Sequence, residues 1–214
     1  MIIKKLDLSA VAPAMQRYID DEILAGISAI VLVDNQPVYE SHFGLRNVEA
    51  GEAMTADTIY RIYSNTKIVT SVAAMCLFED GKFGLDDTLD QWFPKFANLR
   101  VLREPNSSPD DTVPLQRVAT VRELMSHNAG FSYGIFQESS IDRLYVESGV
   151  IAPTSTLAEM EDRLANIPLA NQPGARWQYS VSTDLLARLV EIWSGKSFPD
   201  FLESRIFGPL GMVD

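Results

Sequence analysis

The sequence Ser64-Asn65-Thr66-Lys67 leads directly into an apolar run, Ile68–Phe78 (IVTSVAAMCLF). Apolar residues fall on most faces of this run, which predicts a buried helix. A serine at the start of a helix and a lysine one turn later lie on one face, so their side chains can meet. The partial positive charge at the helix N-terminus favours a serine alkoxide and disfavours a protonated lysine. The pattern predicts that Lys67 accepts the Ser64 proton near neutral pH, and the alternative is a serine and a lysine without chemistry on the surface.

The segments around this helix predict an α+β chain. Residues 8–25 have the apolar spacing of an amphipathic helix that stops at Gly26, and Ile27–Val33 and Val38–Phe43 are β-prone runs around a turn, which indicates a hairpin. Two strands alone make a marginal sheet, so either the hairpin packs on helices or further strands belong beside it. Beyond residue 84 the pattern is almost entirely helical, with helical pieces at 86–92, 121–127, 157–166, 182–193 and 199–207 and long loops at 103–112 and 128–140.

Composition excludes several classes of protein. The chain has 214 residues with 18 Lys+Arg against 29 Asp+Glu, a net charge of −11, and its basic residues are scattered, which argues against a nucleic-acid partner. No segment approaches the roughly 18 apolar residues of a membrane span. One cysteine and two histidines are too few for a zinc cage. We expect no metal or organic cofactor. Because the N-terminal residues do not form a signal peptide, we expect a cytoplasmic protein.

A second serine motif competes with Ser64. Gly130–Gly134 (GFSYG) matches the G-x-S-x-G of a nucleophile elbow, with Ser132 as the nucleophile. That elbow joins a strand to a helix and is followed along the chain by its acid and its histidine. Here the preceding segment is helical in pattern, and both His42 and His127 come before Ser132. The sequence therefore predicts that Ser132 is not the nucleophile.

Four segments stand out along the chain: residues 60–67 (YRIYSNTK), 124–131 (LMSHNAGF), 173–180 (PGARWQYS) and 207–212 (FGPLGM). Taken together, they resemble the penicillin-recognising serine hydrolases, and within them the class C β-lactamase-like esterases called family VIII carboxylesterases. The segments occur in the order that family shows them, which makes the set far more specific than any one motif.

The resemblance implies a mechanism and a set of site residues. Ser64 would be the acylated nucleophile, Lys67 its proton partner, and Tyr179 the general base or acid that passes the proton to the leaving group. A tyrosine has an ordinary pKa near 10, so it becomes a useful base only where an ammonium such as that of Lys67 stabilises its phenolate. From their positions we expect Phe131 and Tyr133, with Ile135 and Phe136, to line an acyl pocket, and His127 to brace a loop.

Two departures from the family pattern narrow the expected function. The β-lactamases and peptidases have Tyr-x-Asn, whereas Val181 stands at the third position here and cannot donate that hydrogen bond to substrate. We therefore expect Val181 to contact substrate without a polar group, which favours simple esters over β-lactams. The second departure is that no K-T-G-like or H/W-x-G segment follows Tyr179. In the family that segment lies on a strand that supplies one oxyanion-hole donor, so we expect a truncated chain that lacks the C-terminal strands.

These observations predict an α+β, β-lactamase/transpeptidase-like fold with an N-terminal helix and hairpin and a mostly helical domain. We expect the N-terminal part of the α/β domain at 1–80, the helical domain at 81–178, and the tyrosine motif with return helices at 179–214. The predicted activity is that of a serine carboxylesterase that hydrolyses small esters through a Ser64 acyl-enzyme. The alternatives are a β-lactamase or D,D-peptidase-like enzyme, an inactive fragment that assembles with a complementary C-terminal polypeptide, and a homo-oligomer paired through the hairpin edge.

Overall fold

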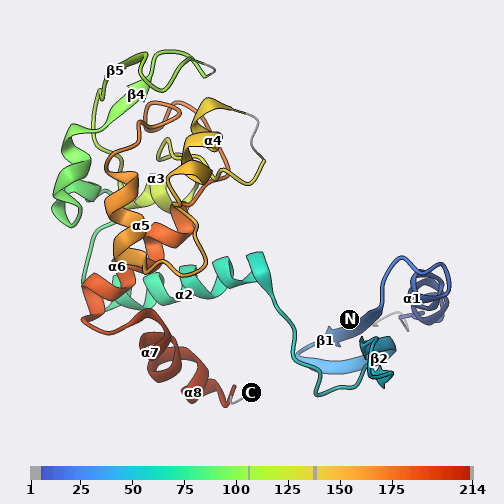
Figure 1. Ribbon diagram of the computed structural model, residues 1–214. Helices are drawn as coiled ribbons and strands as arrows, with labels where there is room; N and C mark the ends of the chain where they lie inside the picture. The colour runs from blue at the N-terminus through green and yellow to red at the C-terminus, as the bar shows by residue number, and fades with distance from the viewer. Residues whose placement is uncertain (1–5, 106, 137–138, 213–214) are drawn as a thin grey trace. The chain divides into compact units, whose positions relative to one another are not determined.

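The computed structural model describes residues 6–105, 107–136 and 139–212, and the chain divides into two compact units between Arg61 and Ile62 (Figure 1). The first unit holds α1 (Val11–Asp20), β1 (Gly26–Val33), β2 (Gln36–Asn47) and β3 (Glu52–Ala53). The predicted helix within residues 8–25 and the predicted hairpin are both present.

The hairpin of the first unit closes through a two-residue turn. Asp34 and Asn35 both have left-handed backbone, with φ of +51° and +59°, which is the conformation that matches the twist of antiparallel strands. The strands pair antiparallel in the order β1-β2-β3, and α1 packs against β2. Among the described residues β1 has a strand neighbour on one side, so its other edge is open.

The second unit is a helical body with one small sheet. Its longest elements are α2 (Thr66–Glu79) and α6 (Ser182–Ser194), and β4 pairs antiparallel with β5. The other elements are η1 (Tyr63–Asn65), η2 (Leu89–Gln91), η3 (Pro94–Asn98), β4 (Arg100–Leu102), β5 (Thr112–Pro114), α3 (Val121–Met125), α4 (Ser140–Glu147), α5 (Leu157–Leu164), α7 (Phe198–Leu202), the π-helical turn η4 (Glu203–Phe207) and α8 (Gly208–Leu210).

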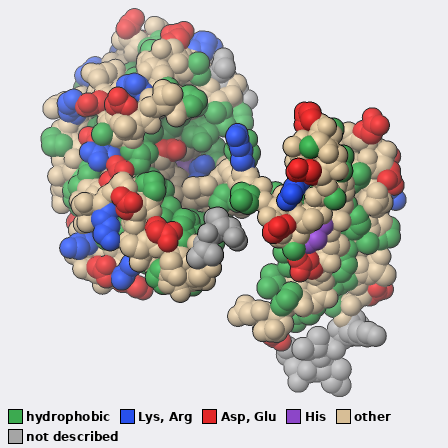
Figure 2. All heavy atoms as spheres, turned by 60° about the horizontal axis from the view of Figure 1, so that its bottom comes forward, with side chains coloured by type: hydrophobic (Ala, Val, Ile, Leu, Met, Phe, Trp, Pro, Cys, Tyr) green, Lys and Arg blue, Asp and Glu red, His purple; other side chains and the backbone are tan. Residues whose placement is uncertain are grey.

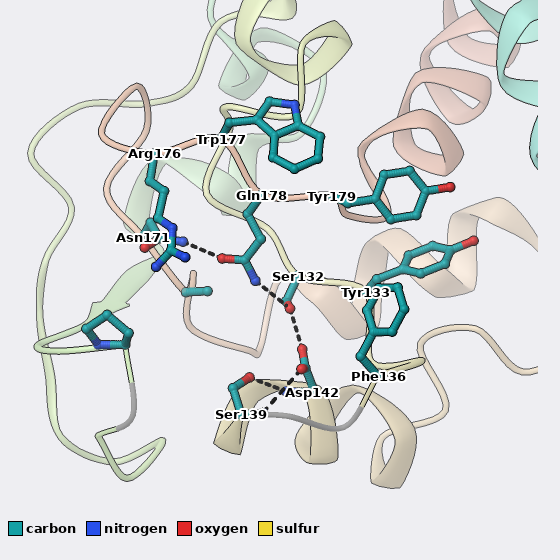
Figure 3. Close-up of a pocket in the computed structure, with 12 residues that line it drawn as sticks. Ser132, Tyr133, Phe136, Ser139, Asp142, Asn171, Arg176, Trp177, Gln178 and Tyr179 are labelled. Carbon is teal, nitrogen blue, oxygen red and sulfur yellow. Dashed lines mark hydrogen bonds between the residues drawn. The ribbon is translucent and has the colours of Figure 1, made fainter.

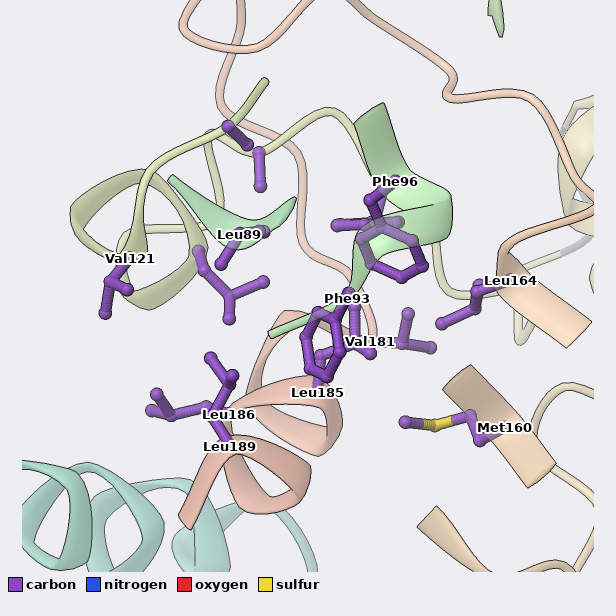
Figure 4. Close-up of a cluster of buried hydrophobic side chains, with 14 of the residues drawn as sticks. Leu89, Phe93, Phe96, Val121, Met160, Leu164, Val181, Leu185, Leu186 and Leu189 are labelled. Atoms are coloured by element: carbon purple, nitrogen blue, oxygen red, sulfur yellow. The ribbon is translucent and has the colours of Figure 1, made fainter. Parts of the chain in front are cut away.

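The core of the second unit is built around α6. This helix packs against α2, α3, α5 and α7, and its inward side chains meet aliphatic and aromatic residues from most of the other elements (Figure 4). Burying each such side chain contributes about 1.5–3 kcal/mol. The core fixes the segment just before α6 against the start of α2, and this determines where the candidate site forms. The fully buried side chains include Leu89, Phe93, Phe96, Leu124, Leu164, Leu185, Leu186 and Leu189.

The prediction that α2 is buried on most faces holds for one face only. That face packs on α6 and consists of Thr70, Ala73, Ala74 and Leu77. The opposite face is apolar but exposed, with exposed fractions of 66% for Ile68, 46% for Val72 and 37% for Met75. The hydrophobic pattern therefore marked two faces of α2, of which the second unit covers one.

Short helices of the second unit begin at capping boxes. The side chains of Thr120, Ser139 and Thr156 each accept a hydrogen bond from the backbone N–H three residues on. The acidic side chain at that third position accepts a hydrogen bond in return from the backbone N–H of the cap residue. A cap of this kind contributes about 1 kcal/mol, which compensates for the small length of these helices.

The predicted domain limits at residues 80 and 178 stay predictions.

The surface carries both signs of charge. On the face of the larger unit shown in Figure 2, Lys and Arg side chains are interspersed with Asp and Glu. Across residues 6–105, 107–136 and 139–212, none of the helices is long and apolar enough to cross a membrane.

Candidate active site

Ser64 lies where a 3-10 turn runs into α2. The turn η1 ends at Asn65 and α2 begins at Thr66. The preceding residue, Tyr63, has a φ of +43°, in the left-handed region that side chains other than glycine rarely adopt. Such a conformation costs of order 1–3 kcal/mol and persists where the surroundings fix it, often at functional sites. This turn sets Ser64 at the head of α2, with Lys67 one turn further along the same face.

Tyr179 reaches this serine from a segment 115 residues later in the chain. Its Oη lies 3.0 Å from Ser64 Oγ, and Lys67 Nζ lies 5.0 Å from the centre of the Tyr179 ring. Tyr179 stands just before α6, so the packing of α6 on α2 brings the two motifs together. The structure therefore assembles all three residues that we predicted to be catalytic.

The electrostatic surroundings of Tyr179 favour its ionised form. Its pKa is lowered, first by the interaction with the Lys67 ammonium and next by the hydrogen bond with Ser64, while burial and the charge of Asp184 act in the opposite direction. A phenol with a lowered pKa is deprotonated closer to neutral pH. Its oxygen lies 3.0 Å from Ser64 Oγ, within the distance over which a base could accept the hydroxyl proton.

The pKa of Lys67 is shifted in the opposite direction from the sequence-based prediction. Burial alone would lower its pKa, but the interaction with Tyr179 and the charges of Tyr133, Tyr179 and Asp184 outweigh burial, so the pKa of Lys67 is raised. The prediction of a lowered pKa was wrong because it considered the helix N-terminus without the acidic groups that face the lysine. The raised pKa keeps Lys67 an ammonium at neutral pH, so a cation lies beside the Tyr179 ring.

Asp184 is a site residue that the sequence analysis missed. It lies in the first turn of α6 and lines the same pocket as Ser64 and Lys67. Its Oδ2 is buried and has no hydrogen-bond partner among the described residues. Burial raises the pKa of its carboxyl group, whereas the charge of Lys67 lowers it. An acidic residue in the first turn of a helix is common for reasons of helix stability, so its position in the sequence did not point to the site.

Tyr133 forms the wall next to Lys67 and Tyr179. The centre of its ring lies 5.4 Å from Lys67 Nζ and 5.4 Å from the centre of the Tyr179 ring. Burial, followed by the charge of Asp184, raises the pKa of Tyr133, so this phenol keeps its proton and can donate a hydrogen bond. Two neighbouring phenols thus have pKa values displaced in opposite directions, an arrangement that suits an acid–base site.

Two pockets of the second unit meet at Tyr133. The nucleophile pocket has a volume of about 350 Å³ and is lined by Tyr63, Ser64, Thr66, Lys67, Thr70, Tyr133, Leu157, Thr183, Asp184, Ala187 and Phe198. The Arg176 pocket has a volume of about 470 Å³ and is lined by Pro105, Ser132, Tyr133, Phe136, Ser139, Asp142, Ala170, Asn171, Arg176, Trp177, Gln178 and Tyr179 (Figure 3). A substrate held at Ser64 therefore has a second cavity within reach.

The three residues predicted to bind substrate have different positions. Tyr133 lines both pockets, as described above. Phe131 is 2% exposed and packs in the core beside Phe96, with ring centres 5.7 Å apart, and Val181 is fully buried. Neither Phe131 nor Val181 is among the residues that line the two pockets. Their roles in substrate binding stay predictions.

Ser132 is held in a buried hydrogen-bond network. Its Oγ donates to Asp142 and accepts from Gln178 Nε2 at 2.8 Å, and its backbone N–H donates to Tyr145 Oη at 3.2 Å. The side chain is 2% exposed, and both histidines lie outside this network as the structure describes it. These contacts give Ser132 a structural role, and the prediction that it is not the nucleophile stays a prediction.

His127 braces the segment that carries Tyr179. Its Nδ1 accepts a hydrogen bond from the Ser180 backbone N–H at 3.2 Å, and its carbonyl oxygen accepts one from the Gln178 N–H at 2.9 Å. Burial, followed by the nearby charge of Lys67, lowers the pKa of His127, so the ring stays neutral and keeps Nδ1 as an acceptor. The predicted loop-bracing role is confirmed by these contacts.

Within residues 6–105, 107–136 and 139–212, no three metal-ligating side chains come together.

The comparison with protein families agrees with this geometry. The family model described as Beta-lactamase matches residues 11–214, which is nearly the whole chain. The chain belongs to the beta-lactamase family. The predicted resemblance to the β-lactamase-like serine hydrolases is confirmed.

The related proteins include esterases. Esterase EstB of Burkholderia gladioli is 31% identical over 98% of this chain and 52% of its own length. Lovastatin esterase of Penicillium rubens is 32% identical over 83% of this chain and 44% of its own length. The solved structure of EstCE1, a hydrolase with promiscuous acyltransferase activity, aligns with a TM-score of 0.81 at 28% identity, over 95% of this chain and 51% of that one. These likenesses confirm the predicted fold class, and the chain spans about half the length of the curated relatives it matches.

Proposed function

We propose that this beta-lactamase family chain carries the acylation site of a serine carboxylesterase. The observation that supports it most directly is the 3.0 Å contact between Ser64 Oγ and Tyr179 Oη. The lowered pKa of Tyr179 and the raised pKa of Lys67 give the phenol the role of base and the ammonium the role of stabilising cation.

The proposed reaction proceeds through an acyl-enzyme. The Tyr179 phenolate takes the Ser64 hydroxyl proton while Oγ bonds to the ester carbonyl carbon. The tetrahedral intermediate collapses as the bond to the alcohol oxygen breaks, and Tyr179 returns its proton to that oxygen. A water molecule then attacks the acyl-enzyme by the same steps in reverse, with Tyr179 again as the base. The 3.0 Å contact carries the proton from Ser64 to Tyr179 and, after deacylation, back to Ser64, whereas the other two transfers run between Tyr179 and the leaving alcohol or the attacking water.

Simple esters suit this site better than β-lactams. The Asn of the Tyr-x-Asn motif places an amide near substrate in the β-lactamases and peptidases. Here Val181 occupies that position. Its aliphatic side chain offers no polar atom, and it is fully buried. We therefore expect hydrolysis of short-chain esters and no turnover of a chromogenic cephalosporin.

Acyl transfer to an alcohol is a close variant of the same chemistry. Water and alcohols compete for one acyl-enzyme, and the relative EstCE1 is described as having both activities. Added methanol or butanol should therefore divide the product between the acid and a new ester.

The chain spans about half the length of its curated relatives, and the proposal includes assembly with a complementary polypeptide. The open edge of β1 is compatible with such pairing and with a homo-oligomer. The cytoplasmic location stays a prediction.

The test is acyl-enzyme formation with a 4-nitrophenyl butanoate. We expect a burst of one equivalent of 4-nitrophenol before steady turnover and, in samples quenched during the burst, a mass increase of one butanoyl group on the peptide that contains Ser64. Ser64→Ala should abolish both signals. The matched control is Ser9→Ala in the first unit, which should leave them unchanged. Butanoylation that persists in Ser64→Ala would contradict the proposal.

A further inference from the structure

The Arg176 pocket contains a cation without a carboxylate partner. Arg176 makes no ion pair with any of the described residues. In a chain of net charge −11, this leaves a guanidinium free at the wall of a pocket of about 470 Å³. The arginines that do pair with carboxylates are Arg46, Arg103, Arg117, Arg122, Arg188 and Arg205.

The rest of the pocket offers aromatic walls and amides. In Figure 3, Arg176 lies beside Asn171 at one end, while the rings of Tyr133 and Tyr179 lie towards the other. The exposed ring of Trp177, with an exposed fraction of 62%, follows Arg176 directly in the sequence. Such a pocket suits a ligand with an apolar stem and an anionic end, because aromatic rings bind the stem and a guanidinium matches a carboxylate.

One carboxylate, that of Asp142, also lines this pocket, so its charge must be considered. Asp142 is 6% exposed and accepts a hydrogen bond from the Ser132 hydroxyl group. It also accepts one from the Ser139 backbone N–H at 3.3 Å. These bonds hold the Asp142 carboxyl group within the wall, whereas Arg176 is exposed.

We propose that the Arg176 pocket binds an anionic group of the substrate, so that the preferred esters carry a carboxylate on the part that extends past Tyr179. This inference rests on the proposed function, since it places the ester carbonyl at Ser64, next to Tyr179. The pocket adjoins the reacting atoms because Tyr179 both contacts Ser64 Oγ and lines the pocket.

A kinetic test uses matched pairs of esters. The first pair is the mono-4-nitrophenyl ester of adipic acid and 4-nitrophenyl hexanoate, which have six-carbon acyl groups with and without a terminal carboxylate. The second pair places the charge on the alcohol side, as the butanoate esters of 4-hydroxybenzoate and 4-hydroxybenzamide. In at least one pair, Arg176→Gln should lower the ratio of kcat/KM for the anionic ester to that for the neutral ester by about threefold to tenfold. Arg176→Lys should restore part of the ratio, because it keeps the charge.

The matched control is Arg143→Gln on α4. Arg143 is exposed and does not line the Arg176 pocket, so its loss changes the net charge by the same amount and should leave both ratios unchanged. Ratios that are equal in the wild type and in Arg176→Gln for both pairs would overturn the inference while leaving the esterase proposal intact. A wild type that cleaves none of the four esters would count against the esterase proposal. In that case the binding test below decides the inference.

A binding test needs no turnover. Trp177 lies in the pocket wall, so a ligand in the pocket should change its fluorescence. We expect 3-phenylpropanoate to bind about threefold to tenfold more tightly than 3-phenylpropanamide, and Arg176→Gln to remove the preference. Trp177→Phe should remove the signal, which assigns it to this pocket. Equal binding of the acid and the amide by the wild type, or a preference that survives Arg176→Gln, would contradict the inference.

Discussion

Ser64 Oγ and Tyr179 Oη lie 3.0 Å apart although 115 residues separate them. One residue stands at the head of α2 and the other just before α6, and these helices pack on each other within the second unit. The hydrogen bond is therefore a product of the helical core, and the chemistry of the site depends on that packing.

The first prediction concerns the base. Tyr179→Phe removes the oxygen that accepts the Ser64 proton but keeps the ring. Because general acid–base catalysis contributes about 10²–10⁴-fold, we expect phosphonylation of Ser64 by a fluorophosphonate to slow by that factor. Mass spectrometry of samples quenched at successive times measures the rate. Tyr18→Phe, at an exposed position on α1, is the matched control. A rate in Tyr179→Phe within twofold of the wild type would exclude Tyr179 as the base.

The second prediction concerns Lys67. In the wild type the phosphonylation rate should rise with pH through the pKa of Tyr179, which lies below its usual 10. Lys67→Gln removes the cation that is the largest cause of this lowering. The phenolate then forms at higher pH, so the inflection of the pH–rate profile should move upward. An inflection that stays in place, or moves downward, would show that Lys67 does not stabilise the phenolate.

The third prediction gives a shift of opposite sign. The charge of Asp184 raises the pKa of Tyr179, so Asp184→Asn should lower this pKa and move the inflection to lower pH. Since Asn has nearly the shape of Asp, the change should alter charge more than packing. An upward shift in Asp184→Asn would contradict the assigned role. Ultraviolet titration of the tyrosines provides a readout that does not depend on the reaction.

The fourth prediction separates Ser132 from catalysis. Ser132→Ala removes the hydroxyl group that donates to Asp142 and accepts from Gln178, so each of these two side chains loses one hydrogen bond. We expect the free energy of unfolding to fall by about 1–3 kcal/mol, measured by urea denaturation. The adduct at Ser64 should still form in the folded variant. Loss of that adduct in a folded Ser132→Ala protein would restore Ser132 as a nucleophile.

Short motifs predicted the centre of the site. The spacing of Ser64 and Lys67 and the motif around Tyr179 identified three groups that the structure brings together. Helix periodicity identified α2 and α6 to within two residues, because both are long enough to repeat the pattern. These features are local in the sequence, so they could be recognised without a structure.

Other features depend on tertiary contacts. The charge of Asp184 reaches Lys67 across the pocket, so the raised pKa of that lysine had no sequence signal. The strands β4 and β5 have three residues each, too few for an alternating pattern. The segment 128–140 was expected to be loop, and α4, which begins at its last residue, was missed although Ser139 and Asp142 form the capping box that begins it. Residues 86–92 were predicted to be helical, and the structure has there the single 3-10 turn η2.

The most direct test of the central claim is mass spectrometry of the intact chain before and after treatment with a fluorophosphonate ester, followed by peptide mapping of the adduct. A serine activated by Tyr179 and Lys67 should react at a single position, and we predict one adduct per chain, on the peptide that contains Ser64. An adduct on Ser132, or a chain that stays unmodified although it is folded, would contradict the account.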